Sequence, residues 1–331
     1  MTARSPDVAS VTSWVGDAVK APSMHNAQPW RFRYMPDPGV LRLRMDPTRV
    51  MPRTDPEARG LHLGCGAALF NVRVAAAHAG WSCEIDLLPD SADPELLASV
   101  SFVRPAGGDL VSGLYPSIAR RHTSREPFSD EAVPEAIRDG LSGAAVAEGA
   151  RLTFMGDWQV QNALDLVWDA EREEALSPSA REEIARWTDA ESRGETTEGI
   201  PGYAFGPRPR DSRVPVRDFG TVSPVAGRRW TAFERSPCLA VLGTRGDQQR
   251  DWLLAGQAME RVLLQATQDG LSTSLNSQAL EWPELRWALR DPLLAGGVPQ
   301  MLIRLGYGPA TPETPRRPVS AVLDIGPSEH S

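Results

Sequence analysis

The amino-acid sequence predicts an α+β protein whose two halves repeat one another. Segments that alternate apolar and polar residues, as strands do, are interspersed with segments that carry apolar residues every three or four positions, as helices do. The two longest helical segments, 57–80 and 247–270, superpose when the first is shifted by 190 positions. The elements around them recur in the same order, so we expect an internal duplication.

The first half begins with a helix predicted over 7–19. Trp30–Met35 and Val40–Met45 each alternate like a strand, and the turn sequence Pro36-Asp37-Pro38-Gly39 between them predicts a hairpin. Small and apolar residues then recur at three and four over 57–80, which predicts a helix with a tightly packed face that stops at Gly80.

The second half repeats this order of elements. The matched positions of the long helices are Gly66 with Gly256, Leu69 with Met259, Val72 with Val262, Ala76 with Ala266, and Gly80 with Gly270. Outside them, 7–19 and Trp30–Met35 resemble 135–149 and 151–155, and 94–100 resembles 299–305. Amphipathic helices look alike, so the conserved order carries the inference more than any one match does. We therefore divide the chain into halves at 1–110 and 111–331.

One segment of the second half, 165–218, has no counterpart in the first. It combines an acidic helix predicted over 179–192 with a Gly/Pro/Arg-rich stretch over 199–215. Such an insertion is either a lid or a solvated elaboration.

Composition excludes some function classes. The chain of 331 residues is 41% hydrophobic, which is enough for a substantial core. Its formal net charge of -8 argues against a general nucleic-acid binder, because phosphate binding requires a basic face. Any basic site must therefore be a small local cluster.

The cysteines and the N-terminus predict a soluble cytoplasmic protein. The three cysteines are odd in number and lack the short paired spacing of a zinc site or redox motif, so we interpret them as reduced. Residues 1–20 lack the apolar stretch of a secretory signal, and no segment approaches the roughly 20 apolar residues of a membrane span.

Residues 21–30, Ala-Pro-Ser-Met-His-Asn-Ala-Gln-Pro-Trp, form the most distinctive loop sequence. Hydrogen-bonding side chains lie between two prolines, and the loop ends in the tryptophan that begins a strand. A rigid polar loop of this kind suits an aromatic heterocycle with polar edges. The alternative is that Asn26 and Gln28 cap the preceding helix and Trp30 only packs.

A second cluster, Arg120-Arg121-His122-Thr123-Ser124-Arg125, combines guanidinium groups, hydroxyls and an imidazole. Such a set can neutralise and hydrogen-bond a phosphate dianion. The alternative is a solvated basic patch. The same two interpretations apply to Arg316 and Arg317, which follow near the C-terminus.

These motifs resemble those of the FMN-dependent nitroreductase family. Residues 22–30 are similar to its Pro-Ser-x-x-Asn-x-Gln-Pro-Trp loop, and 121–125 to its Arg-x-Ser-x-Arg segment, with Thr123 in place of serine. The resemblance implies the nitroreductase fold, with mostly antiparallel sheet flanked by helices. It also implies FMN as cofactor, NADPH or NADH as reductant, and a small organic substrate.

The resemblance assigns roles to individual residues. The flavin ring is expected to meet Pro22, Ser23, Met24, Asn26 and Gln28. The phosphate is expected to meet Arg121, Thr123, Arg125, Arg316 and Arg317, with His122 beside the ring or ribityl chain. The family also passes backbone near flavin N5 and O4 at Asn276, Ser277 and Gln278, although its Glu-Gly pair is absent there. No protein nucleophile is required, because the redox chemistry occurs on flavin N5.

The two kinds of motif lie in different halves. The ring loop occurs only in the first half, and the phosphate segments only in the second. We therefore expect one FMN per chain and a monomer that mimics the family's homodimer, as in its Acg-like branch. Two alternatives to an oxidoreductase are an FMN storage protein with little turnover and a non-flavin structural protein.

No other motif predicts a competing site. Gly64-Cys65-Gly66 lacks the third glycine of a dinucleotide fingerprint, and the histidines lack metal-ligand spacing. We expect no metal, no nucleic acid and no membrane partner.

Overall fold

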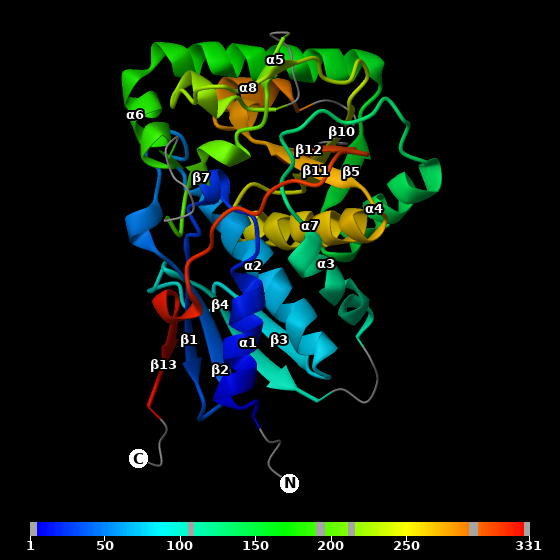
Figure 1. Ribbon diagram of the computed structural model, residues 1–331. Helices are drawn as coiled ribbons and strands as arrows, with labels where there is room; N and C mark the ends of the chain where they lie inside the picture. Colours follow the sequence, from blue (N-terminus) through cyan, green and yellow to red (C-terminus); the bar gives the residue numbers. More distant parts are fainter. Residues whose placement is uncertain (1–4, 105–108, 190–195, 211–215, 291–296, 328–331) are drawn as a thin grey trace.

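Two mostly antiparallel sheets lie on opposite sides of a central pair of long helices, α2 (Arg59–His78) and α7 (Gln249–Gln268) (Figure 1). The computed structural model describes residues 5–104, 109–189, 196–210, 216–290 and 297–327.

The first sheet has the strand order β13-β1-β2-β4-β3. Its elements are α1 (Val8–Ala18), β1 (Trp30–Met35), β2 (Val40–Met45), β3 (Ser82–Leu87), β4 (Leu96–Val103) and β13 (Leu323–Ile325). The predicted hairpin forms with the expected bounds, with Trp30 opposite Met45 and Met35 opposite Val40. The Asp7 carboxylate caps α1 by accepting from the Ser10 amide.

The second sheet, with strand order β11-β12-β10-β5, has the same topology. Its elements are α4 (Glu135–Ala147), β5 (Arg151–Phe154), β10 (Cys238–Thr244), β11 (Ser272–Asn276) and β12 (Val298–Gly306). When each sheet is followed from one edge to the other, the order β5-β10-β12-β11 corresponds to β1-β2-β4-β3. The helices α4 and α7 correspond to α1 and α2. The predicted order of elements is therefore present in the fold.

The central helices touch through the two glycines that the 190-residue shift had matched. A Cβ on Gly66 would lie 2.3 Å from the Leu253 carbonyl oxygen, and a Cβ on Gly256 would lie 2.2 Å from that of Leu63. Leu63 and Leu253 are themselves 190 positions apart, so the contact is reciprocal. Only residues without a side chain allow two helix backbones to approach this closely.

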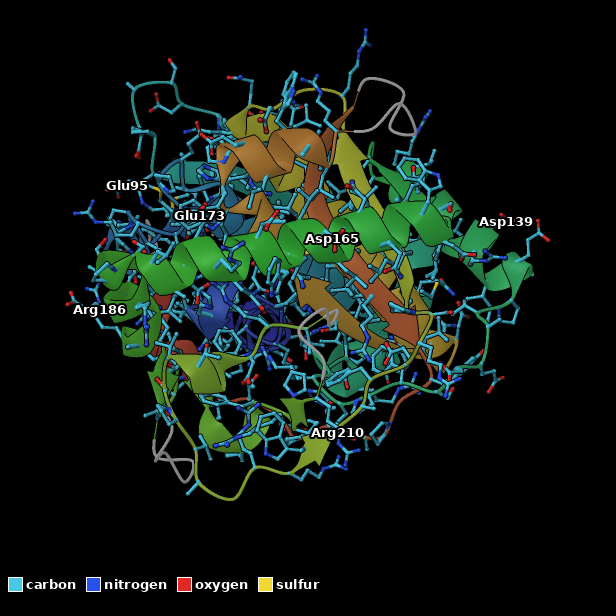
Figure 2. All side chains as sticks on the ribbon, turned by 90° about the horizontal axis from the view of Figure 1, so that it is seen from above. Glu95, Asp139, Asp165, Glu173, Arg186 and Arg210 are labelled. Atoms are coloured by element: carbon cyan, nitrogen blue, oxygen red, sulfur yellow. The ribbon has the colours of Figure 1, made fainter. Side chains whose placement is uncertain are left out.

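The segment between β5 and β10 differs from the prediction. Asp165 lies in the middle of α5 (Asp157–Leu176), which runs across the second half in Figure 2. The extra segment therefore covers 157–237, up to the start of β10. The acidic helix was predicted over 179–192, but the structure has a shorter helix, α6 (Pro178–Arg186), followed by β6 (Thr188–Asp189). The predicted extent of this helix is therefore wrong. Residues 190–195 and 211–215 lie outside the described residues.

Short elements complete the chain. They are α3 (Tyr115–Arg120), β7 (Ile200–Pro201), β8 (Arg208–Pro209), β9 (Trp230–Thr231) and α8 (Pro283–Ala288). After β12 the chain crosses from the second half to the first, where β13 pairs parallel with β1 (Figure 1). This crossing brings residues 312–317 alongside the loop at 22–30.

Within the described residues, α2 alone has the length and apolar composition of a membrane span. It is the central core helix, with 89% of its most apolar window buried inside the protein. Its apolar character is explained by packing against α7 and the first sheet.

Candidate functional site

The loop between α1 and β1 has an unusual backbone. His25, Asn26 and Gln28 all adopt left-handed conformations, with φ of 47°, 55° and 52°. Non-glycine residues seldom occupy this region, and such strain collects at ligand sites where surrounding contacts maintain it. The loop is therefore a preformed element rather than a simple connection.

Asn26 and Gln28 tie this loop to two distant segments. The Asn26 amide donates to the carbonyls of Gly199 and Pro315, each at 2.9 Å. The Gln28 amide donates to the Thr197 carbonyl at 2.8 Å, and its oxygen accepts from the Arg317 amide at 2.8 Å. The loop thus fixes both the extra segment and the C-terminal crossing beside the first half.

A pocket of about 840 Å³ opens between the loop and the second half. This volume is in the range of about 300–1,000 Å³ that is typical of small-molecule sites. Both halves supply its walls, including the predicted residues Pro22, Ser23, Met24, Asn26, Arg121, His122, Thr123, Arg125, Ser277, Gln278 and Arg316. Eleven predicted residues that are far apart in the sequence therefore meet at one cavity.

The basic part of the pocket is formed by Arg121, His122 and Arg316. Arg121 and Arg316 both donate to the Lys20 carbonyl, at 3.0 and 3.2 Å, so their guanidinium groups are neighbours. Burial, together with the charge of Arg121, lowers the pKa of Arg316 to about 9 and holds the pKa of His122 below its usual value. Two crowded cations of this kind are suited to an anionic group.

Arg125 lies in a different part of the pocket from this pair. Its guanidinium is over the Phe219 ring at 5.2 Å and donates to the Ala204 carbonyl at 3.1 Å. Burial and neighbouring Arg217 lower its pKa to about 10. The structure therefore separates Arg125 from the other predicted phosphate ligands.

His25 faces the same region as Arg125. Its ring meets Phe219 edge to face at 5.5 Å, and its Nε2 atom is buried without a hydrogen-bond partner. Burial, then the charges of Arg217 and Arg125, keep its pKa well below 6.5. His25 is thus a neutral imidazole at neutral pH.

Gln278 connects the pocket wall to a buried acidic group on α5. Its amide donates to Glu171 at 3.1 Å, while its own Oε1 is buried without a partner. Burial raises the pKa of Glu171 to about 7, and Glu174 adds to the shift. Nearby Arg217 is paired with Glu174 and with Glu281, the latter at 2.8 Å.

We expect Glu171 to make the protein less stable as pH rises. A raised carboxyl pKa means that the folded state binds the proton more tightly, so this contribution is complete below about pH 4.5 and is lost as pH approaches 7. Glu171→Gln should remove a pH-dependent change on the order of 2 kcal/mol in the free energy of unfolding, measured with urea at pH 5 and pH 8. The exposed control Glu173→Gln should keep the wild-type difference, and an unchanged difference in Glu171→Gln would contradict the assignment.

Three predicted residues lie behind the pocket wall instead of on it. Gln28 and Asn276 are buried, and the Asn276 oxygen accepts from the Gln278 amide at 3.3 Å. Arg317 turns away toward the Ala321 carbonyl and Asp46. Gln28 and Asn276 accept hydrogen bonds from the backbone amides of Arg317 and Gln278, and these bonds hold the neighbouring wall residues in place.

The structure adds residues that motif comparison missed. Met259 and Met301 supply an apolar wall, Phe219 and Arg217 come from the extra segment, and Arg59 is a buried cation that donates to the Gln300 carbonyl at 2.5 Å. Trp287 forms an exposed rim. Met259, Met301 and Arg59 lie in segments that the duplication matched, but that match predicts elements and not ligand contacts. Phe219 and Arg217 belong to a segment without a recognisable motif.

We expect Asn26→Ala to loosen the covering segments without emptying the pocket. The substitution removes both anchors of the Asn26 amide, so residues 197–200 and 312–316 should become more susceptible to limited proteolysis. The flavin that the sequence resemblance implies should still bind but be reduced at a different rate, measured by stopped-flow absorbance. Asn162→Ala, on the exposed side of α5, is the control, and identical proteolysis and reduction in both variants would refute this role.

Fold and site together define an α+β protein with two sheets of like topology around a central helix pair, and with a ligand pocket lined from both parts of the chain. No family model matches the chain. A protein of Mycobacterium tuberculosis H37Rv named "Putative NAD(P)H nitroreductase Rv3131" is 33% identical over 336 residues, 98% of this chain and 94% of that protein. Another from the same strain, "Putative NAD(P)H nitroreductase acg", is 31% identical over 338 residues, 98% and 99% of the two chains.

The chain therefore belongs to the nitroreductase family. Its resemblance to the Acg-like branch and its α+β nitroreductase fold are thereby confirmed. Among solved structures, a BluB-like flavoprotein from Clostridium difficile 630 matches 63% of this chain and 96% of its own, with a TM-score of 0.41 and 14% identity. A nitroreductase from "sphigopyxis sp. strain HMH", described as FMN and NADPH-dependent, covers 64% and 97%, with a TM-score of 0.40 and 13% identity. Both likenesses are remote, and the family assignment rests on the sequence relatives.

Proposed function

We propose that this chain is an FMN-dependent oxidoreductase that binds one FMN between its halves. The observation that carries the proposal is the joint pocket, to which the first half contributes the strained loop and the second half contributes Arg121 and Arg316. The relatives' names supply the nitroreductase activity and NAD(P)H, and FMN is named for the solved structures. The division of the ring and phosphate motifs between the halves supports a single FMN and a monomeric chain.

The residues of the pocket fit such a cofactor. Arg121 and Arg316 are adjacent cations suited to the phosphate, and each has at least one buried guanidinium nitrogen that lacks a hydrogen-bond partner. Gln278 and His25 likewise carry buried polar atoms without partners, on the side suited to a heterocyclic ring. Buried polar groups in native proteins are normally satisfied, so a polar ligand at this place explains several exceptions at once.

We assign phosphate contacts to Arg121 and Arg316, with Thr123 and His122 beside them, and ring contacts to residues 22–26. Because Arg125 is on Phe219 and near His25, we place it at the ring side. Ser277 and Gln278 face the same side, and Arg317 is proposed to act only through Gln28. In this arrangement 1–110 provides the ring half and 111–331 the phosphate half.

When bound, FMN supplies hydride acceptance and donation at N5, which the protein side chains lack. The chain's own residues bind and orient the ring, and neutral His25 offers a hydrogen-bonding group beside it. The apolar side chains of Met259, Met301 and Phe219 exclude water from the inner wall. NADPH or NADH is the proposed reductant, and a small organic molecule the acceptor.

The alternative is an FMN storage protein with little turnover. It is favoured by the residues that the extra segment places over the pocket, Phe219 and Arg217, the latter fixed by two largely buried carboxylates. A cover held this firmly would limit substrate access.

Steady-state assays separate the two functions. Purified protein with bound FMN is mixed with NADPH or NADH and with nitroaromatic and quinone acceptors. An oxidoreductase should complete many turnovers per FMN with at least one pair. Reduction limited to one equivalent per FMN with every pair would favour storage.

A further inference from the structure

A fully buried carboxylate, Glu260 on α7, lies behind Arg121 and Arg316, the two arginines of the basic part of the pocket. Its side chain has no exposed surface, and its Oε1 is 3.5 Å from Nε of Arg121. This separation is longer than a good charge-assisted hydrogen bond, so the pair compensates poorly for the burial of both charges. Nothing in the proposed redox function requires an acidic group at this position.

The charged groups around Glu260 come from several elements. Arg121 follows α3, Arg316 lies in the C-terminal crossing, and the neutral amide of Asn71 approaches from α2. On the α4 side, Glu148 is closed into ion pairs with Arg73 and Arg261. The charges that act on Glu260 are therefore chiefly those of Arg121 and Arg316, the two arginines that we assign to the phosphate.

Two further pairs of charged groups lie at the outside of the region around Glu260. On α1, Asp17 pairs with Lys20 at 2.8 Å, and at the rim His122 lies 3.9 Å from the exposed Glu313. The pKa of His122 is below 6.5, so the imidazole is neutral above pH 7.

We propose that Glu260 competes with the bound phosphate for Arg121 and Arg316, so that binding of FMN above neutral pH is accompanied by uptake of a proton on Glu260. The inference rests on the proposed function. A phosphate dianion next to these arginines repels the Glu260 carboxylate. It also pairs with the two guanidinium groups, so they stabilise the carboxylate less, and both effects favour the protonated acid. Cofactor affinity is thereby linked to pH through a side chain that need not touch the cofactor.

The direction of the pH effect follows from the free protein. Burial raises the pKa of Glu260 to about 7, against the opposing effects of Arg121, Asn71 and Arg316. At pH 6.5 about three-quarters of the acid is already protonated, so binding takes up only a small fraction of a proton. At pH 8 about nine-tenths of the free protein carries the carboxylate, and binding must then take up nearly one proton.

Calorimetric titration of the flavin-free full chain tests the linkage. With FMN we expect uptake of about one proton at pH 8, measured in two buffers of different ionisation enthalpy, and a Kd about five- to tenfold higher at pH 8 than at pH 6.5. Riboflavin, which lacks the phosphate, should bind without proton uptake. The second phosphate pKa is about 6, so ionisation of the phosphate itself favours binding at pH 8 and cannot produce the expected weakening.

The variant Glu260→Gln should bind FMN with a Kd that changes less than twofold between these pH values, whereas exposed Glu173→Gln should behave as wild type. If Glu260→Gln does not fold, the contrast between FMN and riboflavin in the wild-type chain decides alone. FMN binding without proton uptake, equal uptake with riboflavin, or an unchanged pH effect in Glu260→Gln would overturn the inference. Absence of FMN binding at either pH would overturn the proposed function together with it.

Discussion

Replacement of Arg121 by alanine is expected to weaken FMN binding about 10- to 100-fold. A hydrogen bond to a charged group contributes about 1.5–3 kcal/mol, and 1.4 kcal/mol corresponds to a factor of ten. Arg121 is buried next to Arg316, and part of its guanidinium has no partner within the protein. Quenching of flavin fluorescence during titration measures the change.

The loss should be specific for the phosphate. Riboflavin affinity in Arg121→Ala should stay within about threefold of wild type, because the missing contact concerns only the phosphate group. Arg120→Ala is the matched control: its side chain is exposed at the end of α3, where it bonds back to the Pro116 carbonyl and Ser117. Equal losses of FMN and riboflavin affinity in Arg121→Ala would contradict the phosphate assignment.

Gly66→Ala is expected to lower the free energy of unfolding by about 3 kcal/mol. Its Cβ would lie 2.3 Å from a backbone oxygen and 3.0 Å from the Gly256 Cα. Backbone atoms cannot rotate away, so the helices must separate, and overpacking of a core costs about 1–3 kcal/mol or more. The flanking residues Leu63 and Met259 line the pocket, so FMN affinity should fall as well.

A glycine in another helix provides the opposite expectation. A Cβ on Gly143, in α4, meets no atom within 4 Å, and alanine should stabilise that helix by about 0.5–1 kcal/mol. Urea unfolding of the two variants at pH 7 measures both effects. A Gly66→Ala protein as stable as Gly143→Ala would show that α2 and α7 do not touch at this point.

Local sequence predicted most of the regular elements. Trp30–Met35 and Val40–Met45 were correct because alternation and a Pro-Gly turn act locally, and the stops at Gly80 and Gly270 were correct because both glycines have positive φ. The pairing of β1 with β13 was not predictable, because it joins residues almost 300 positions apart. The extra segment was also misjudged, since polar α5 resembles a solvated helix although one of its faces packs on the second half.

The candidate site was predictable where a motif names residues, and less so where packing selects them. Motifs in the sequence predicted that Ser23, Asn26, Arg121 and Arg316 belong to one site, and all four line the pocket. It could not distinguish wall residues from residues behind the wall, such as Gln28, because both belong to the same loop. Glu260 had no signal, since within its helical pattern the acid occupies a position that looks like an ordinary polar one until α2 and α3 bury it.

The number of FMN molecules per chain tests the central claim most directly. Freshly purified protein should show flavin absorbance, release one FMN per chain on denaturation, and have the mass of a monomer in solution. A colourless protein that FMN cannot reconstitute, or a ratio of two per chain, would contradict a single site shared between the two halves.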